Sequence, residues 1–247
     1  SQPKQIMPKF VTRLIERIEV ADGMMAFAFE RPADFSFTAG QFLTITLPNP
    51  LYNDAKGNRR TFSIASPPQE VERLQITTRM RGSALKRSLA EMALGTPVEL
   101  FGPAGSFTLH KGASMPAVFI AGGISIAPFR SMIHDVFARH LTHQITLIYS
   151  NGNPEGAPFH DEFLRIAEAH TKFKYVPATT HADKLRQPWA RLRRYVDADF
   201  LREHIGDIMT PIFYIAGPPD MVAGVSKAVI EAGTDSARIR SEKFEGY

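Results

Sequence analysis

Residues 117–130 read Ala-Val-Phe-Ile-Ala-Gly-Gly-Ile-Ser-Ile-Ala-Pro-Phe-Arg, which predicts an apolar strand, a glycine turn and the start of a helix. Glycines let a backbone approach a pyrophosphate closely, and the free amides at a helix N-terminus favour a phosphate. Pro128 is tolerated near a helix start because its missing amide hydrogen would be unpaired there. The stretch therefore predicts a strand–turn–helix unit that can hold a phosphate group.

The second half of the chain repeats this alternation of strand and helix. Apolar strands are predicted at residues 117–121, 145–149, 173–178 and 212–216, and helices at 127–139, 157–170, 199–204 and 220–232. Such alternation is typical of a parallel sheet covered on both faces. A second glycine turn, Gly217-Pro218-Pro219-Asp220-Met221, follows the fourth strand. Because α/β sheets bind ligands at the carboxyl ends of their strands, the two glycine turns point to one crevice.

The first ~110 residues have the pattern of an antiparallel barrel, in which many short strands are separated by turns. Strands are predicted at residues 10–20, 24–29, 42–47, 60–66 and 73–78, and one helix at 83–94. Gly102-Pro103-Ala104-Gly105-Ser106-Phe107 predicts a tight turn that ends this part. We therefore expect a β-barrel domain over residues 1–112 and an α/β domain over residues 113–247.

Two segments of the first half carry candidate binding groups. Arg60-Thr61-Phe62-Ser63 offers a cation for a phosphate, a ring to cover a flat ligand and a hydroxyl for the ligand's edge, although on its own the segment is more often an ordinary strand with Arg and Ser facing solvent. Arg79 to Lys86 follows a strand and opens a helix that Ser83 can cap. The free amides beyond Ser83 would face an anion, or the segment is simply a capped structural helix.

Composition excludes several classes of function. The 247 residues contain no cysteine, so disulfides, thiol redox chemistry and thiolate-ligated iron–sulfur clusters are excluded. The net charge of +4 favours anionic cofactors or an acidic partner, and we expect no nucleic-acid partner. No stretch approaches the roughly 18 apolar residues of a membrane span, and no signal pattern is visible, so a cytoplasmic location is expected. No metal site is expected, and His140 and His143 are predicted to be a solvated surface pair.

A serine hydrolase is a weak alternative. Gly123-Ile124-Ser125-Ile126-Ala127 approximates the nucleophile elbow G-x-S-x-G. A hydrolase would also need an acid and a histidine, and Asp197, Asp199 and His204 follow in that order. Those three crowd one short helix, whereas a catalytic triad draws its members from separate loops.

Taken in order, these segments resemble the ferredoxin–NADP reductase-like flavoproteins over nearly the whole chain. The matches are Arg60–Ser63 with R-x-[YF]-S, Gly102–Phe107 with G-P-x-G-x-F, Ala121–Phe129 with G-G-x-G-I-A-P-F, Gly217–Met221 with G-P-P-x-M, and Glu242–Phe244 with E-x-[YF]. The resemblance implies an N-terminal antiparallel Greek-key β-barrel that binds FAD and a C-terminal Rossmann-like domain that binds NADH or NADPH.

The resemblance also implies residue roles. Arg60 and Thr61 would bind the flavin, Arg60 through a phosphate; Phe62 would cover one face of the isoalloxazine and Ser63 would lie near its N5. The turn Gly82-Ser83-Ala84 would cradle the pyrophosphate, which favours FAD over FMN. Phe244 would cover the other flavin face beside Glu242, which makes Ser63, Glu242 and Phe244 the predicted catalytic residues. The residues implied for the nicotinamide coenzyme are Gly122, Gly123, Ser125, Ile126, Ser150, Asn151, Gly217, Pro218 and Met221.

The chain departs from the family pattern at a few positions. Ser125 replaces a glycine and would weaken coenzyme binding if its position needs a positive φ. Tyr247 is an alternative to Phe244 as the aromatic cap. No arginine follows the second strand to pair with a 2′-phosphate, which favours NADH, although Arg186 or Arg191 could approach from a loop.

The resemblance implies a reductase that transfers a hydride from NAD(P)H to bound FAD and passes electrons to a separate acceptor, such as an acidic ferredoxin or flavodoxin. Two alternatives stay open: a reductase of free flavin, quinone or ferric chelates, and a non-catalytic flavin-binding electron-transfer subunit.

Overall fold

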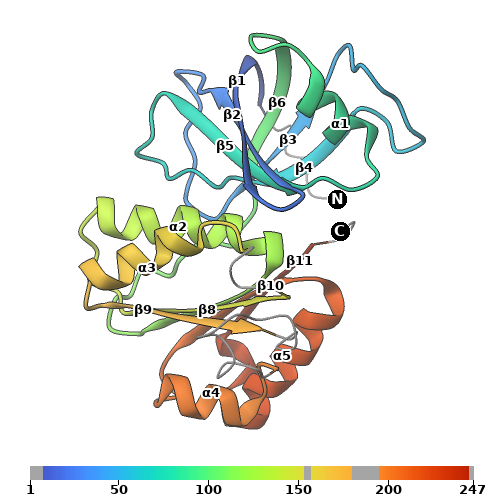
Figure 1. Cartoon of the computed structure of the whole chain (residues 1–247). Coiled ribbons are helices and arrows are strands. Elements are labelled where there is room, and N and C mark those ends of the chain that lie inside the picture. Colours follow the sequence, from blue (N-terminus) through green and yellow to red (C-terminus); the bar gives the residue numbers. More distant parts are fainter. Residues whose placement is uncertain (1–7, 153–156, 180–194, 245–247) are drawn as a thin grey trace, which may run out of the picture.

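Two β-sheets, one from each half of the chain, organise the computed structural model, which describes residues 8–152, 157–179 and 195–244 (Figure 1). No helix within these ranges combines the length and the apolar character that a membrane crossing needs. Residues 105–116 connect the two sheets. The predicted boundary between residues 112 and 113 falls in this connection and stays a prediction.

The first sheet is antiparallel and has six strands. They are β1 (Lys9–Ala21), β2 (Met24–Glu30), β3 (Phe42–Thr46), β4 (Arg59–Ser63), β5 (Arg73–Arg79) and β6 (Pro97–Ala104). Their order is β4-β3-β6-β1-β2-β5, and an antiparallel bridge between Ile64 and Ile76 joins the two edges. Helix α1 (Ala84–Glu91) buries Leu85 and Leu89 against the interior. The result is the predicted Greek-key barrel, with β6 placed between β3 and β1.

The second sheet is parallel and has five strands in the order β11-β10-β7-β8-β9. They are β7 (Ala117–Gly122), β8 (Ile145–Asn151), β9 (Phe173–Thr179), β10 (Ile212–Gly217) and β11 (Ile239–Lys243). The helices are α2 (Ala127–Ala138), α3 (His160–Ala169), α4 (Ala198–Ile205) and α5 (Pro219–Ala232). Short 3₁₀ turns at Gly123–Ile126 and Ser236–Arg238 complete the described elements. Figure 1 shows α2 and α3 on the face toward the barrel and α4 and α5 on the other face.

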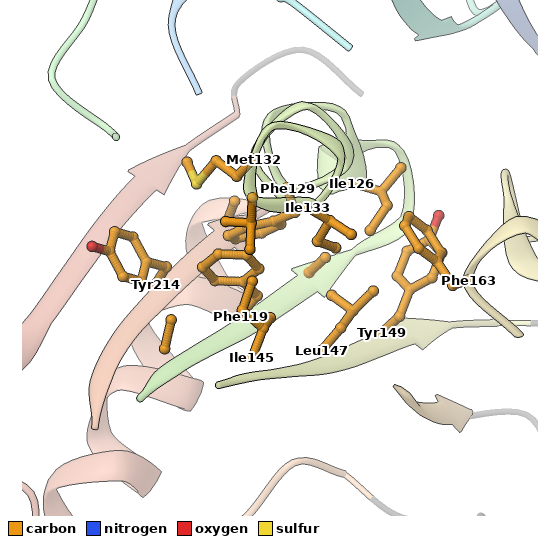
Figure 2. Close-up of a cluster of buried hydrophobic side chains, with 14 of the residues drawn as sticks. Phe119, Ile126, Phe129, Met132, Ile133, Ile145, Leu147, Tyr149, Phe163 and Tyr214 are labelled. Atoms are coloured by element: carbon orange, nitrogen blue, oxygen red, sulfur yellow. The ribbon is translucent and has the colours of Figure 1, made fainter. Parts of the chain in front are cut away.

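Alternate residues of the central strands supply two separate cores. Phe119 of β7 packs with Phe129 and Ile133 of α2 on the barrel side (Figure 2). Val118 and Ile120 of the same strand belong to the core under α4 and α5. Because both faces are buried, these strands are apolar throughout, which is why the sequence predicts a parallel sheet correctly.

Hydrogen bonds between α2 and the barrel fix the relative position of the two sheets. Ser131 Oγ donates to the Ser66 carbonyl at 2.8 Å, and Arg130 Nη1 donates to the Ala65 carbonyl at 3.0 Å. Glu162 of α3 in turn pairs with Arg130, with Nε and Oε1 2.8 Å apart. The end of β4 and the start of α2 are thereby held side by side, and the cavities described below lie at this junction.

Two strands were not among those predicted from the sequence. The predicted tight turn at residues 102–107 is wrong at its start, because Gly102–Ala104 belong to β6. Proline and glycine in this strand hide an alternation in which Val98, Leu100 and Gly102 are buried. The other strand, β11, has a mostly polar sequence because it lies at the edge of the sheet and pairs with β10 alone.

The predicted surface pair of histidines is also wrong in part. His143 is buried, and its Nε2 lies 2.9 Å from the His110 carbonyl, whereas His140 is exposed. The His110 ring in turn bonds the Tyr214 hydroxyl at 3.0 Å. Periodicity alone cannot reveal this, because the partners come from the connecting segment and from β10. In the described part of the chain, no group of His, Asp or Glu side chains is arranged to hold a metal ion.

Candidate functional site

A cavity of about 450 Å³ lies between the barrel, the start of α2 and the residue that follows β11. All four residues of the Arg60–Ser63 segment line it, although strand alternation would divide them between two faces. Its lining also includes Gly82 and Ser83 from the turn before α1. The structure therefore brings together the barrel residues that the sequence singled out, apart from Ala84, which begins α1 directly behind Ser83.

Two aromatic rings contribute to the cavity wall from distant parts of the chain. Phe62 comes from β4 and packs into the barrel core. Phe244 follows β11, and its amide donates to the Gly217 carbonyl at 3.0 Å. Figure 1 shows β11 at the edge of the parallel sheet, with its end directed toward the barrel. The cavity therefore has aromatic surface from both domains, which suits a flat ligand. Tyr247, the alternative cap, lies outside the described residues.

The cavity is strongly cationic. Its lining contains Lys56, Arg60, Arg79, Arg81 and Lys86 and no acidic residue. Burial lowers the pKa of Lys86, and the nearby Arg60 guanidinium lowers it further. Cations this close repel one another unless an anion lies between them, so the lining favours a ligand with phosphate groups.

The Arg60 guanidinium is held from several sides. Its Nη1 donates to the carbonyls of Lys56, Gly57 and Arg59 at 2.7, 3.1 and 2.6 Å. Its Nη2 lies 3.2 Å from Asp54 Oδ1. Arg60 is thus a fixed part of the cavity wall rather than a flexible surface cation.

The N-terminus of α1 carries the predicted cap. Ser83 has extended backbone, and its Oγ accepts from the Lys86 amide at 3.4 Å. The Ala84 amide donates to Asp54 Oδ2 at 2.8 Å. Sequence reasoning missed Asp54, because it reaches α1 from a loop thirty residues earlier. The sequence analysis interpreted residues 79–86 only as a strand end and a helix start. It did not predict that the side chains of Arg79, Arg81 and Lys86 line the cavity.

A second cavity, of about 800 Å³, opens at the carboxyl ends of the parallel strands. The predicted coenzyme residues that line it are Gly122, Gly123, Ser150, Asn151, Pro218 and Met221. Arg79, Arg81 and Ile124 line both cavities, so the two spaces share a wall. Arg186 and Arg191, named above as candidates for a 2′-phosphate, lie outside the described residues.

The two glycine turns form a notch that Met221 fills. A Cβ atom on Gly122 would lie 2.2 Å from the Met221 sulfur, and one on Gly217 would lie 2.7 Å from it. Gly217 itself does not line the cavity but lies behind this methionine. At both turns an added Cβ would first meet a flexible side chain, which occupies part of the space that the glycines leave. The close approach of these turns to a pyrophosphate stays a prediction.

The concern about Ser125 is not supported by its backbone. In the turn over Gly123–Ile126, the positive φ belongs to Gly123, at +54°, and not to Ser125. Ser125 and Ile126 are fully buried and line neither cavity, so their side chains are not placed to touch a coenzyme. The same burial removes the basis of the hydrolase alternative, because a substrate could not reach the Ser125 hydroxyl.

Glu242 is an acid in an unusual setting. It pairs with Ala216 in the sheet register, two residues before Phe244. Its Oε2 is buried, and none of the described residues donates a hydrogen bond to it. Burial raises the pKa of this carboxyl to about 7. A group with such a pKa can hold or release a proton near neutral pH.

Comparison with known proteins identifies relatives in two ways. Residues 119–227 match the family model described as the oxidoreductase NAD-binding domain. The chain is 27% identical to ferredoxin–NADP reductase B of Sorangium cellulosum, over 96% of this chain and 98% of that protein. It is also 27% identical to terephthalate 1,2-dioxygenase reductase component 1 of Comamonas sp, over 84% of this chain. The chain spans 59% of the length of the latter relative.

Solved structures show the same two-domain architecture. The cytochrome P450 reductase GcoB of Amycolatopsis superposes with a TM-score of 0.81 at 25% identity, covering 96% of this chain and 71% of that one. A ferredoxin–NADP reductase of Neisseria gonorrhoeae, solved with FAD and NADP bound, gives 0.78 at 21% identity, over 95% and 98% of the two chains. The motifs, the fold and these relatives agree: residues 119–227 match the oxidoreductase NAD-binding domain, and the chain is similar over nearly its whole length to the ferredoxin–NADP reductase-like FAD- and NAD(P)-binding oxidoreductases.

Proposed function

We propose that the chain is an NAD(P)H-dependent, FAD-containing reductase that delivers electrons to a separate acceptor. The observation that carries this proposal is the wall shared by the two cavities, to which Arg79, Arg81 and Ile124 contribute. Hydride transfer requires the two reacting rings to be in contact. A flavin in the first cavity and a coenzyme in the second would have their rings next to each other without a large movement of the domains.

The donor set of the first cavity fits FAD. Aromatic side chains from both domains suit a flat ring system, and the cationic lining suits a pyrophosphate. The glycine turn at Gly122 and Gly123, which lines the second cavity, fits a coenzyme, because glycine lets the backbone approach a ligand closely. Bound flavin would supply the redox chemistry by taking a hydride from reduced coenzyme and releasing electrons singly or as a pair.

The protein residues would bind the phosphates of the flavin, cover its ring and hold a proton beside it. Arg60, Lys86 and the start of α1 would hold the phosphates, and Phe62 would line one side of the ring. Phe244 would shield the other side until coenzyme displaces it. Ser63, buried in the cavity wall, offers a hydroxyl for the ring edge. Glu242, with a pKa of about 7, would store a proton beside the site.

The acceptor is proposed to be a small acidic electron carrier such as a ferredoxin or flavodoxin. Two observations support it: the relative from Comamonas is the reductase component of a dioxygenase, and this chain has a net charge of +4, which favours an acidic partner. We also propose a cytoplasmic location, where such carriers and reduced coenzymes occur together.

Anaerobic stopped-flow spectroscopy tests the proposal. The purified full chain should be yellow, release a flavin with the mass of FAD, and bleach when NADH or NADPH is added. Screening a ferredoxin, a flavodoxin, free flavin, a quinone and a ferric chelate as acceptors would then separate the proposed reaction from the alternatives. A colourless protein that takes up no flavin would refute the assignment.

A further inference from the structure

One arginine of α2 contacts both domains. Arg130 Nη1 donates to the Ala65 carbonyl at 3.0 Å and to Gln75 Oε1 at 3.1 Å, and both acceptors belong to the barrel. Its Nε and Nη2 donate to the two carboxylate oxygens of Glu162 in α3, at 2.8 and 3.1 Å. The guanidinium also lies over the Phe159 ring, 4.6 Å from its centroid. A single planar group therefore joins the barrel to the helices that cover the parallel sheet.

The barrel end of this contact lies next to the proposed flavin site. Ala65 follows Ser63 by two residues, and Ser63 lines the first cavity. The Ala65 amide donates to the Gln75 carbonyl at 2.7 Å, so this segment is fixed to β5 as well as to Arg130. At the other end, α2 begins directly after the turn that carries Ile124, which lines both cavities. The position of α2 relative to β4 thus sets how the coenzyme cavity lies against the flavin cavity.

Glu162 holds the guanidinium in one orientation. Both side chains are largely buried, with exposed fractions of 15% for Arg130 and 21% for Glu162. Burial alone would raise the pKa of Glu162, but the His134 ring, whose Nε2 lies 2.6 Å from Oε1, and the Arg130 charge together lower it. The carboxylate is therefore charged at neutral pH, and two parallel hydrogen bonds to it fix the plane of the guanidinium. The bonds from Arg130 to the barrel are thereby tied to the position of α3.

We propose that Arg130 is a positioning residue for hydride transfer: by holding the segment after β4 against α2, it sets the approach of the nicotinamide ring to the flavin ring. The inference rests on the proposed reductase function. Arg130 lines neither cavity, so it acts through the backbone that it holds and not by touching a ligand. A displacement of about 1 Å between two reacting groups can lower a rate about a hundredfold, so hydride transfer is sensitive to such a contact.

Other contacts keep the two domains together when Arg130 is replaced. Ser131 Oγ donates to the Ser66 carbonyl at 2.8 Å, and Gln69 Nε2 donates to Asp135 Oδ1 at 2.6 Å. Loss of the Arg130 contact is therefore expected to shift α2 against β4 rather than to separate the domains.

The test is anaerobic stopped-flow reduction of the FAD-loaded full chain by NADH and by NADPH. Arg130→Met removes all four hydrogen bonds and should lower the limiting rate constant at saturating coenzyme by about tenfold or more. It should also weaken the charge-transfer band and leave the coenzyme Kd unchanged. Arg130→Lys keeps the charge beside Glu162 but not the planar fork, so it should show a smaller loss, and it carries the test if Arg130→Met does not fold.

Two controls separate positioning from general damage. Reduction by dithionite, which needs no stacked coenzyme, should be equally fast in the wild type and in every variant. Arg165→Met is the matched substitution, because Arg165 is exposed on α3 and donates to the Asp161 carbonyl of its own helix at 3.2 Å. This variant should match the wild type in every measurement.

An unchanged limiting rate constant in a folded Arg130 variant would overturn the inference. A loss confined to the coenzyme Kd or to flavin retention, or an equal loss with dithionite, would overturn it as well, because each would make Arg130 a general structural contact. A wild-type protein whose flavin is reduced by neither NADH nor NADPH would instead refute the proposed reductase function.

Discussion

Replacing Glu242 by glutamine should change how the stability of the protein depends on pH. The carboxyl has a folded-state pKa of about 7 because burial disfavours its charged form. Its ordinary value is 4.5. Below about pH 4.5 the carboxyl is protonated in both the folded and the unfolded protein, so it does not lower the free energy of unfolding. As the pH rises from there to about 7, only the unfolded chain releases the proton, so the free energy of unfolding of the wild type falls.

The magnitude follows from the difference between the two pKa values. Each pKa unit corresponds to about 1.4 kcal/mol, which gives about 3 kcal/mol for full burial. Because water reaches part of the residue, we expect about 2 kcal/mol. For a chain of this length, a difference of about 2 kcal/mol between the wild type and the variant corresponds to about 5 °C in Tm. Glu242→Gln cannot ionise, so the variant should lack this loss and exceed the wild type in stability at alkaline pH.

The assay is thermal unfolding of both proteins at about pH 5 and about pH 8, with saturating FAD in every sample. Glu168→Gln, which removes an exposed carboxylate of α3, is the control and should follow the wild type at both values. If the difference in Tm between the wild type and Glu242→Gln is the same at both pH values, the argument from the buried Oε2 is wrong.

Three further substitutions test the site. Arg60→Ala should weaken flavin binding about ten- to a hundredfold, because a charge-assisted hydrogen bond contributes roughly 1.5–3 kcal/mol; Arg59→Ala, whose guanidinium lies over the Phe101 ring 4.5 Å away, should not, and equal losses in titration would contradict the assignment. Phe244→Ala should increase the long-wavelength charge-transfer band with coenzyme, since a stacked ring worth about 0.5–1.5 kcal/mol no longer competes; an unchanged spectrum would mean that another residue covers the flavin. Ser125→Gly should leave coenzyme affinity unchanged and lower the free energy of unfolding by about 0.5–1 kcal/mol, because Ser125 has no positive φ to relieve; tighter coenzyme binding in a fluorescence titration would show that the family's glycine matters after all.

Much of the fold was predictable because local sequence carries it. Continuous apolar strands and intervening helices predicted the parallel sheet. Ser83 was predicted as a helix cap from its neighbours alone. The five ordered motifs then predicted the family.

Other features depended on the tertiary structure. The sequence could not show that Asp54 reaches the start of α1, that β11 places Phe244 against the barrel, or that Glu242 lacks a hydrogen-bond partner among the described residues. Nor could it show that Gly123, and not Ser125, takes the positive φ. Sequence patterns report which face of an element is apolar and where a turn must lie, because those are local properties. Which charged and aromatic side chains meet is set by packing between elements far apart in the chain, and that packing alone determines the chemistry of the cavity.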